Sequence, residues 1–449
     1  MEKLFGTDGV RGVANTELTP ELAMQIGKAG AFALAGHLGR QPKILIGTDT
    51  RVSADMLEAA LVAGLCSVGA EIYKAGVIPS PAMAFLVRKY AMDAGVMLSA
   101  SHNPMPDNGI KFFNNAGYKL SDEVEEEIEK LVTENMQNIP RPVGKEVGRS
   151  FFCKNAVQDY VDFLATTTTS NFAGLTVALD CANGATYQAA PLLFEKLGAK
   201  ISVLHNEPTG FNINVNCGST HLASLQDYVR QNGLDIGLAF DGDGDRVLCV
   251  DDTGAELDGD AIMAICGLAM SQKGQLKNGT IVATVMSNLG LEQFCQKNQL
   301  NLVRAQVGDR YVIQEMLQNG YNLGGEQSGH IIFGDYNTTG DGILTGLQIL
   351  AMLKTSGQKL SELRKIMSVM PQVLLSAKLK KRTKVDISQN KNISAAIDDI
   401  SQKLANKGRI LVRASGTEPI IRVMLEGDNE LQIQEYAEKL VGVIESELG

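Results

Sequence analysis

Tryptophan is missing from the 449-residue sequence, and aromatic side chains make up only 5% of it. An excess of positive charge is missing too, because 41 Lys and Arg stand against 51 Asp and Glu for a formal net charge of −10. Proteins that bind nucleic acids rely on a dense basic surface, often with stacking aromatic side chains. We therefore expect no nucleic-acid partner, and any anionic ligand must meet positive charge that is concentrated locally.

Long hydrophobic runs are also absent. The longest nearly apolar stretches cover residues 29–35 and 261–270, far short of the ~20 residues that span a bilayer. The opening residues 1–6 are not followed by the apolar segment of a secretory signal. We therefore expect neither a membrane partner nor export.

Paired cysteines are the third absence. The seven cysteines are scattered and form no C-x-x-C pair, which argues against a disulfide framework and a thiolate zinc site. Free thiols fit a reducing compartment, so we expect a cytoplasmic location. The dinucleotide fingerprint, the P-loop and the Gly-x-Ser-x-Gly elbow are missing as well, which disfavours dinucleotide-binding, NTPase and serine-hydrolase functions.

Short apolar runs of strand length alternate with helical patterns over residues 43–98, 175–240 and 280–323. Each stretch reads β-α-β-α-β, which predicts an α/β domain with a mixed or largely parallel sheet. After Met370 the pattern changes to three short strands and a closing helix. We predict four domains around a central cleft, three similar α/β units and a smaller C-terminal α+β domain, with bounds 1–148, 149–254, 255–367 and 368–449.

Two segments between the repeated patterns stand out. Residues 138–148 are rich in Pro and Gly and predict a linker, and the strongly acidic stretch 123–134 predicts a helix with a solvated face.

A polar loop follows the third strand of each repeated unit: Ser99–Pro104, Asp241–Arg246 and Gly324–His330. Open α/β sheets bind their ligands at the carboxyl ends of parallel strands. The three loops are therefore expected to converge on one shared site.

Asp241, Asp243 and Asp245 alternate with glycines directly after a predicted buried strand. Three carboxylates so close together repel one another unless a cation lies among them. Hard oxygen ligands favour Mg²⁺ or Ca²⁺, and an EF-hand is excluded because Arg246 stands where that loop needs glycine. A solvated acidic turn is the alternative. Mg²⁺ with positions open to phosphate or water fits phosphoryl transfer.

Ser101 and His102 lie in a Ser-His-Asn-Pro loop, which in isolation is equally well explained as a turn ended by Pro104. Beside a Mg²⁺ site, a serine oxygen can carry a phosphoryl group. Lys111 and His102 are then candidates for electrostatic support or proton transfer.

The remaining candidates suit a phosphorylated sugar. Glu326, Ser328 and His330 offer an acceptor, a hydroxyl and an imidazole for sugar hydroxyls or an amine, although short polar loops are common. The segment 413–419 offers a cradle for a phosphate dianion, with a polar hairpin turn as the alternative. Its candidate residues are Arg413, Ser415, Gly416 and Thr417, and further positive charge is available from Arg11, Arg246, Arg310 and Arg422.

Taken in order, these four loops resemble the motifs of the α-D-phosphohexomutase superfamily, and the resemblance covers essentially the whole chain. Residues 5–12, 212–214 with 217–221, and 307–312 are further similar to the branch that acts on glucosamine phosphates. Gln327 stands where the branch for mannose and glucose phosphates typically carries Met.

The resemblance implies interconversion of glucosamine 6-phosphate and glucosamine 1-phosphate through glucosamine 1,6-bisphosphate, feeding UDP-N-acetylglucosamine and cell-wall synthesis. It implies that phosphorylated Ser101 is the active form, primed by a hexose 1,6-bisphosphate, and that one Mg²⁺ is bound by the seryl phosphate and the three aspartates. Substrate binding is then implied for Glu326, Ser328, Arg310, Arg413, Ser415, Gly416, Thr417 and Arg422, and catalytic roles for Arg11 and Arg246.

Several alternatives stay open at this point. Mannose or glucose phosphates are rival substrates, a non-catalytic sugar-phosphate-binding protein is a rival of another class, and a Mg²⁺-dependent phosphatase is a weaker third. Lys111, His330 and His102 all remain candidates for moving the proton. The oligomeric state is open, with a homodimer as one option.

Overall fold

The computed structural model describes the chain apart from residues 1–3, 7, 36–39, 135, 380–388 and 415–419. The chain divides into two compact units, the first formed by Met1–Met286 with Leu300–Ile366 and the second by Ser287–Gln299 with Met367–Gly449. Within the described residues, no helix combines the length and the apolar character that crossing a membrane requires.

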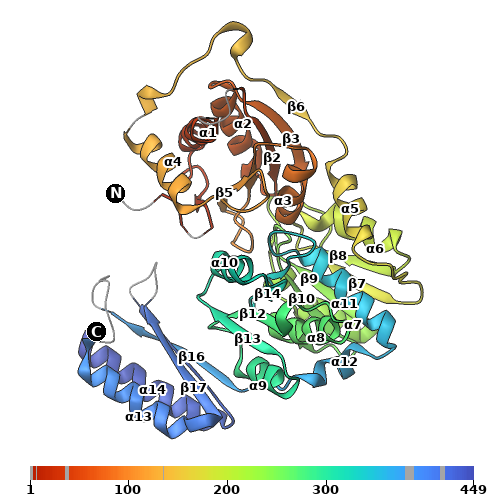
Figure 1. Cartoon of the computed structure of the whole chain (residues 1–449), viewed down its shortest axis with the longest axis vertical. Helices are drawn as coiled ribbons and strands as arrows, with labels where there is room; N and C mark the ends of the chain where they lie inside the picture. Colours follow the sequence, from red (N-terminus) through yellow and green to blue (C-terminus); the bar gives the residue numbers. More distant parts are fainter. Residues whose placement is uncertain (1–3, 7, 36–39, 135, 380–388, 415–419) are drawn as a thin grey trace. The chain divides into compact units, whose positions relative to one another are not determined.

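The first sheet of unit 1 has six strands in the order β1-β5-β4-β2-β3-β6. Figure 1 shows β2 and β3 of this sheet beside α2 and α3. Its central strands are apolar because helices cover both faces, and their parallel pairing puts the loops after β2 and β4 at one edge. The strands are β1 Val10–Val13, β2 Lys43–Thr48, β3 Glu71–Val77, β4 Ala94–Leu98, β5 Asp107–Asn114 and β6 Ser150–Phe152, and the helices are α1 Pro20–Ala35, α2 Ser53–Cys66, α3 Ser80–Lys89 and α4 Asp122–Glu134.

The second sheet has the order β11-β10-β9-β7-β8. The strand β9 runs parallel to β7, and its antiparallel hairpin with β10 carries the Asp241–Arg246 loop at its tip. The elements are α5 Ala156–Thr166, β7 Thr176–Asp180, α6 Thr186–Lys196, β8 Lys200–Leu204, α7 Ala223–Asn232, β9 Ile236–Phe240, β10 Val247–Asp251 and β11 Glu256–Leu257.

The third sheet of unit 1 has the order β13-β12-β14-β15. Here the antiparallel hairpin of β14 and β15 carries the Glu326–His330 loop. The elements in unit 1 are α8 Gly259–Gln272, β12 Thr280–Thr284, β13 Asn301–Ala305, α10 Asp309–Asn319, β14 Leu323–Gly325, β15 Ile331–Phe333, α11 Gly342–Ser356 and α12 Leu360–Leu363.

Unit 2 is an antiparallel sheet in the order β16-β18-β17, packed against helices (Figure 1). Ile400, Val423 and Leu440 are fully or nearly fully buried between them and belong to its own core. The elements are α9 Leu289–Lys297, β16 Gln372–Lys378, α13 Lys391–Leu404, β17 Gly408–Ala414, β18 Ile420–Gly427 and α14 Glu430–Leu448.

The predicted fold class is confirmed: three α/β units with mixed sheets precede a smaller α+β domain. The sequence analysis missed the antiparallel strand that follows each functional loop, because a polar loop breaks the alternating pattern just before β5, β10 and β15. The strand β6 pairs with β3, so the first sheet extends past residue 148.

The acidic helix α4 has the solvated face that was expected, since Glu123, Glu126 and Glu127 are exposed, but one of its acidic residues lies on the buried side. Glu125 and Ile128 are buried, and Glu125 Oε2 accepts a 2.9 Å hydrogen bond from Arg310.

Gly64 allows α1 and α2 to pack closely, because a Cβ there would lie 2.2 Å from the carbonyl oxygen of Met24. We expect Gly64→Ala to lower the free energy of unfolding by ~1–3 kcal/mol, since the helices must separate. Gly442→Ala is the matched control: this glycine also lies inside a helix but has nothing within 4 Å, so alanine should be neutral or stabilising. Calorimetric unfolding measures both, and equal effects would contradict the packing argument.

Candidate active site

Ser101 lies just beyond the carboxyl end of β4, is 1% exposed, and has a left-handed backbone with φ of +53°. Its backbone N–H donates to Ser99 Oγ at 2.9 Å, and Ser99 in turn donates to Asp49 Oδ2 at 2.7 Å. Its hydroxyl donates to Asp241 Oδ2 at 2.6 Å. The serine loop and the aspartate loop therefore meet, as the sequence analysis predicts.

Asp241, Asp243 and Asp245 are all buried, and one ligand atom from each lies within 4.8 Å of the other two. Burial and the neighbouring carboxylates raise the pKa of Asp241 well above its usual range. Burial acts in the same direction at Asp243, but Lys111 brings the pKa of that carboxyl below its usual value. The cluster thus concentrates negative charge in a desolvated place, which is stable only beside cations.

The cluster also leaves polar atoms unsatisfied. Asp243 Oδ1 and Asp245 Oδ1 are buried acceptors without a hydrogen-bond partner, and the Nε atoms of Arg11 and Arg246 are buried donors without one. Buried polar atoms are normally paired, so such orphans point to a missing ligand. Carboxylate oxygens suit a hard cation such as Mg²⁺, and guanidinium donors suit a phosphate oxygen.

Gly242 explains why the aspartates alternate with glycine. A Cβ at this position would lie 2.5 Å from the carbonyl oxygen of Ser101 and 2.8 Å from Asn214 Nδ2. Only glycine lets the serine loop approach the aspartate loop this closely, so the pattern that suggested a metal site also serves the contact between the loops.

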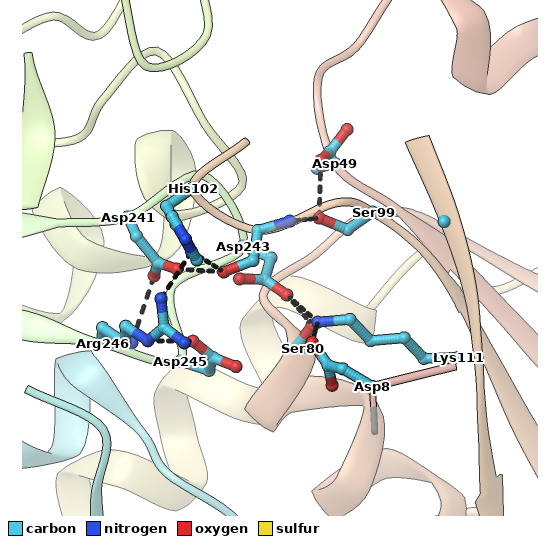
Figure 2. A network of polar contacts seen from close by, with 12 residues as sticks. Asp8, Asp49, Ser80, Ser99, His102, Lys111, Asp241, Asp243, Asp245 and Arg246 are labelled. Atoms are coloured by element: carbon cyan, nitrogen blue, oxygen red, sulfur yellow. Dashed lines mark hydrogen bonds and ion pairs between the residues drawn. The ribbon is translucent and has the colours of Figure 1, made fainter. Parts of the chain in front are cut away.

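Lys111 comes from β5 and is 2% exposed (Figure 2). Its Nζ lies 2.8 Å from Asp243 Oδ2 and 3.4 Å from Asp8 Oδ2, and Ser80 donates to the same Asp243 oxygen at 2.6 Å. The lysine thus brings a positive charge to the edge of the aspartate cluster.

The alternation of charges continues away from the cluster. Asp8 forms an ion pair with Lys119, whose Nζ lies 2.7 Å from Asp309 Oδ2. The same Asp309 oxygen lies 3.7 Å from His330 Nε2, and His330 Nδ1 lies 3.5 Å from Asp245 Oδ2. These groups, with Lys111 and Asp243, link the aspartate loop to residues of the first and third sheets by opposite charges.

His102 is neutral in this arrangement. Burial, with the nearby charges of Arg246 and Arg11, lowers the pKa of His102 to about 4. Its Nδ1 accepts a hydrogen bond from Arg246, which places the ring proton on Nε2. The Ser101 oxygen lies 3.3 Å from the same Nδ1, but its hydrogen is directed to Asp241. His102 is therefore not placed to remove the serine proton.

His330 is 2% exposed, and its Nε2 accepts a 3.0 Å hydrogen bond from the backbone N–H of Gly340. Its Nδ1 faces Asp245 and carries the proton. Both ring nitrogens of His330 thus have partners within the protein. Which residue moves the proton in the reaction stays a prediction.

The loop that carries Glu326 and Ser328 is fixed to the aspartate loop. Val247 N–H donates to the carbonyl of Gly329 at 3.1 Å, and a Cβ on Gly329 would lie 2.3 Å from the carbonyl oxygen of Val247. Glu326 Oε1 accepts from Gly308 N–H at 3.2 Å, while Ser328 is exposed. The carboxylate of Glu326 is also one of the charges that raise the pKa of Arg246 against the effect of burial.

The remaining predicted arginines differ in position. Arg11 forms an ion pair with Asp8, and burial lowers its pKa while Asp243 and Asp245 oppose that shift. Arg310 forms ion pairs with Asp122 and Glu125 of α4. Its binding of substrate stays a prediction.

The segment 413–419, which was predicted to bind phosphate, falls in unit 2. Arg413 on β17 lies directly opposite Arg422 on β18, and burial together with the charge of Arg422 lowers the pKa of Arg413. Two like charges at paired strand positions repel each other, which favours an anion beside them. Ser415, Gly416 and Thr417 lie outside the described residues.

Sequence reasoning missed Asp8, Lys119 and Asp309, which complete the series of alternating charges that begins at Asp243 and Lys111. Asp8 and Asp309 lie in residues 5–12 and 307–312, which were singled out only as resemblances. Lys119 offers no local signal, since its partners are distant in sequence.

Four models of one family together match most of the chain. The models for the phosphoglucomutase/phosphomannomutase α/β/α domains I, II and III match residues 2–139, 158–254 and 258–370, and the model for the C-terminal domain matches 358–443. The chain belongs to the phosphoglucomutase/phosphomannomutase family, which confirms the resemblance seen in the four loops.

The chain is also similar to individual relatives and solved structures. The phosphoglucosamine mutase of Acetivibrio thermocellus is 54% identical over 449 residues, covering 100% of both chains. A phosphoglucomutase/phosphomannomutase family protein of Burkholderia thailandensis superposes with a TM-score of 0.82 at 21% identity, over 99% of this chain and 98% of that one. The Aspergillus fumigatus N-acetylphosphoglucosamine mutase, in complex with GlcNAc-6P and magnesium, gives 0.73 at 18%, over 99% and 96%.

Replacing one carboxylate tests the metal site. Asp241→Asn removes a charge from the repelling cluster, so the metal-free variant should unfold at the same or a higher temperature than the parent. The stabilisation that Mg²⁺ gives the parent should be lost, with binding at least about tenfold weaker. Thermal unfolding with and without Mg²⁺ measures both. Asp227→Asn, at an exposed surface ion pair, is the control. An unchanged response to Mg²⁺ in Asp241→Asn would refute the site.

Proposed function

We propose that this protein is a phosphoglucosamine mutase, which interconverts glucosamine 6-phosphate and glucosamine 1-phosphate and so supplies UDP-N-acetylglucosamine synthesis. The observation that carries the proposal is the buried hydroxyl of Ser101, which donates to the first of three clustered aspartates. The full-length relative at 54% identity carries the same name, which agrees with the function predicted from the sequence.

The chemistry needs two transfers. A phosphoryl group on Ser101 Oγ passes to the free hydroxyl of the substrate: the Oγ–P bond breaks and a new O–P bond forms. The proton of the substrate hydroxyl leaves to a base, and the freed Ser101 Oγ takes up a proton, which it gives up again in the return transfer. Glucosamine 1,6-bisphosphate results. It then presents its other phosphoryl group, which returns to Ser101 Oγ and leaves the product monophosphate. A hexose 1,6-bisphosphate primes the enzyme by the second of these transfers.

Asp241, Asp243 and Asp245 would hold Mg²⁺, and the orphan oxygens of Asp243 and Asp245 fit it. When bound, the ion neutralises charge on the phosphoryl oxygens. The Aspergillus relative was solved with magnesium and a sugar phosphate, which supports both the metal and the substrate class here.

The chain itself supplies the other charges. The unsatisfied Nε donors of Arg11 and Arg246 would bind oxygens of the transferring group, and Lys111 holds Asp243 in place. A loose phosphoryl-transfer transition state depends mainly on such positioning and charge neutralisation. Glu326 and Ser328 would bind sugar hydroxyls, while Arg413 and Arg422 would bind a phosphate group of the substrate.

None of the seven cysteines, all of which lie in the described residues, forms a disulfide. Since free thiols persist in a reducing compartment, we place the reaction in the cytoplasm, where sugar phosphates are metabolised.

Ser101→Ala tests the proposed nucleophile. The variant should lose turnover by at least about 10³-fold, because the phosphoryl group has no acceptor, while the unfolding temperature changes little. Intact-mass measurement after incubation with glucose 1,6-bisphosphate should show one added phosphate on the parent, mapped to Ser101, and none on the variant. Appreciable mutase activity in the variant would refute the role.

A substrate panel tests the sugar. Glucosamine, glucose and mannose phosphates are compared as kcat/KM with pre-phosphorylated protein. We expect the glucosamine substrate to be preferred, and a preference for mannose or glucose phosphate would overturn the assignment.

Arg413→Ala tests the phosphate contact in unit 2. Because Arg413 faces Arg422, removing one charge should leave stability unchanged or slightly improved. The KM for the phosphosugar should rise about tenfold or more, since a charged hydrogen bond to the phosphate is lost. Lys407→Ala, at an exposed residue of the same unit, is the control. A loss of folded protein in place of a KM effect would indicate a structural role.

A further inference from the structure

Hydrogen bonds to its backbone carbonyl oxygens hold the serine loop in place. Arg51 follows β2, its side chain is 0% exposed, and all five of its N–H donors are used. The Nε donates to Asp49, and the two terminal nitrogens donate to the carbonyl oxygens of Pro104, Asp107, Ser101 and Asn103, all at 2.5–3.0 Å. One buried guanidinium thus fixes the path of the chain from 101 to 107.

A second donor reaches two of the same oxygens from the other side. Asn214 Nδ2 donates to the carbonyl oxygen of Ser101 at 2.9 Å and to that of Asn103 at 3.1 Å. Arg51 and Asn214 come from different sheets of unit 1, after β2 and after β8. Residues 212–214 and 217–221 were singled out in the sequence, yet the proposed chemistry gives them no role.

The segment that carries Asn214 is itself fixed. Asn214 has a left-handed backbone with φ of +59°, and its N–H donates to the carbonyl of Ala182 at 2.9 Å. Further along, the N–H of Gly218 donates to the buried carboxylate of Asp180 at 2.9 Å. The amide of Asn214 is therefore presented to the serine loop by a supported backbone.

These contacts bear on two features of the serine loop that cost free energy, its backbone conformation and its buried carbonyl oxygens. Ser101 has a positive φ, which a residue with a Cβ adopts at a cost of order 1 kcal/mol. Its carbonyl oxygen is also buried, and a buried acceptor without donors is costly. Two donors on each of the Ser101 and Asn103 carbonyls remove the second cost and oppose relaxation of the backbone.

We propose that Asn214, together with Arg51, is a positioning residue for phosphoryl transfer. By holding the backbone of Ser101, the two side chains aim its Oγ at Asp241 and keep it there through both transfers. The inference rests on the proposed role of Ser101 as the phosphoryl carrier. A misplacement of about 1 Å at a reacting atom can lower the rate about 100-fold, so the expected effect is on kcat.

The test compares Asn214→Gly with Asn216→Gly. Both asparagines have positive φ, +59° and +53°, so glycine relieves the same backbone strain at each, while Asn216 is exposed. We expect Asn214→Gly to lower kcat about 10- to 100-fold with KM within about twofold. The rate of Ser101 phosphorylation by glucose 1,6-bisphosphate, followed by intact mass, should fall in proportion. Asn216→Gly should match the parent.

The variant Asn214→Asp tests whether the hydrogen bonds donated by residue 214 matter, because it keeps the shape of the side chain and removes the donor. The carboxylate has the same outline but directs an acceptor at two carbonyl oxygens, so the variant should be at least as impaired as Asn214→Gly. Arg51→Lys keeps the charge beside Asp49 but cannot reach four carbonyls, and it should show the same loss of kcat where it folds.

The outcomes are distinct. Parent-like kcat and phosphorylation rate in Asn214→Gly or Asn214→Asp would overturn the proposal, and so would losses that merely follow the fraction of folded protein. A parent enzyme that takes up no phosphate on Ser101 would instead overturn the proposed function itself, before any Asn214 variant is compared.

Discussion

The repulsion among three buried carboxylates is the constraint on which the site depends. Asp241, Asp243 and Asp245 lie on one hairpin tip, where burial makes each negative charge costly. Cationic or proton-donating groups from the other loops partly offset that cost, with Lys111 at Asp243 and His330 at Asp245. One oxygen each of Asp243 and Asp245 still accepts no hydrogen bond, and the cluster could hold a metal ion there.

The same constraint orders the rest of unit 1. Ion pairs through Asp8, Lys119 and Asp309 connect residues of the first sheet to residues of the third. The aspartate loop of the second sheet lies between them. Buried ion pairs contribute little net stability, because the desolvation of both charges offsets most of their attraction. Since stability alone does not require these ion pairs, they are better understood as fixing the relative positions of the serine loop, the aspartate loop and the Glu326–His330 loop.

The sequence allowed the chemistry to be predicted more fully than the contacts. The Asp-Gly-Asp-Gly-Asp pattern and Ser101 carry a local signal, since each follows an apolar strand and each needs residue types that few other roles require. Arg51 follows a strand in the same way, but a lone arginine has no distinctive spacing. The pairing of Arg310 with α4 and the neutral state of His102 depend on residues far away in the chain, which no local pattern encodes.

The hydrogen bond from Ser101 to Asp241 also bears on the proposed role of Ser101 as a phosphoryl carrier. In the free enzyme the hydroxyl proton points at Asp241 Oδ2. If Oγ carries a phosphoryl group, as proposed, that proton is gone and Asp241 loses a donor, so a hydrogen bond of about 0.5–1.5 kcal/mol would favour the unphosphorylated serine. The phosphorylated form must recover this from contacts of its phosphate. The orphan donors of Arg11 and Arg246 could bind that phosphate and so would bring the free energies of the two proposed states closer together. A carrier that gives and takes the same group in each cycle needs such a balance, because a much more stable form would trap the enzyme.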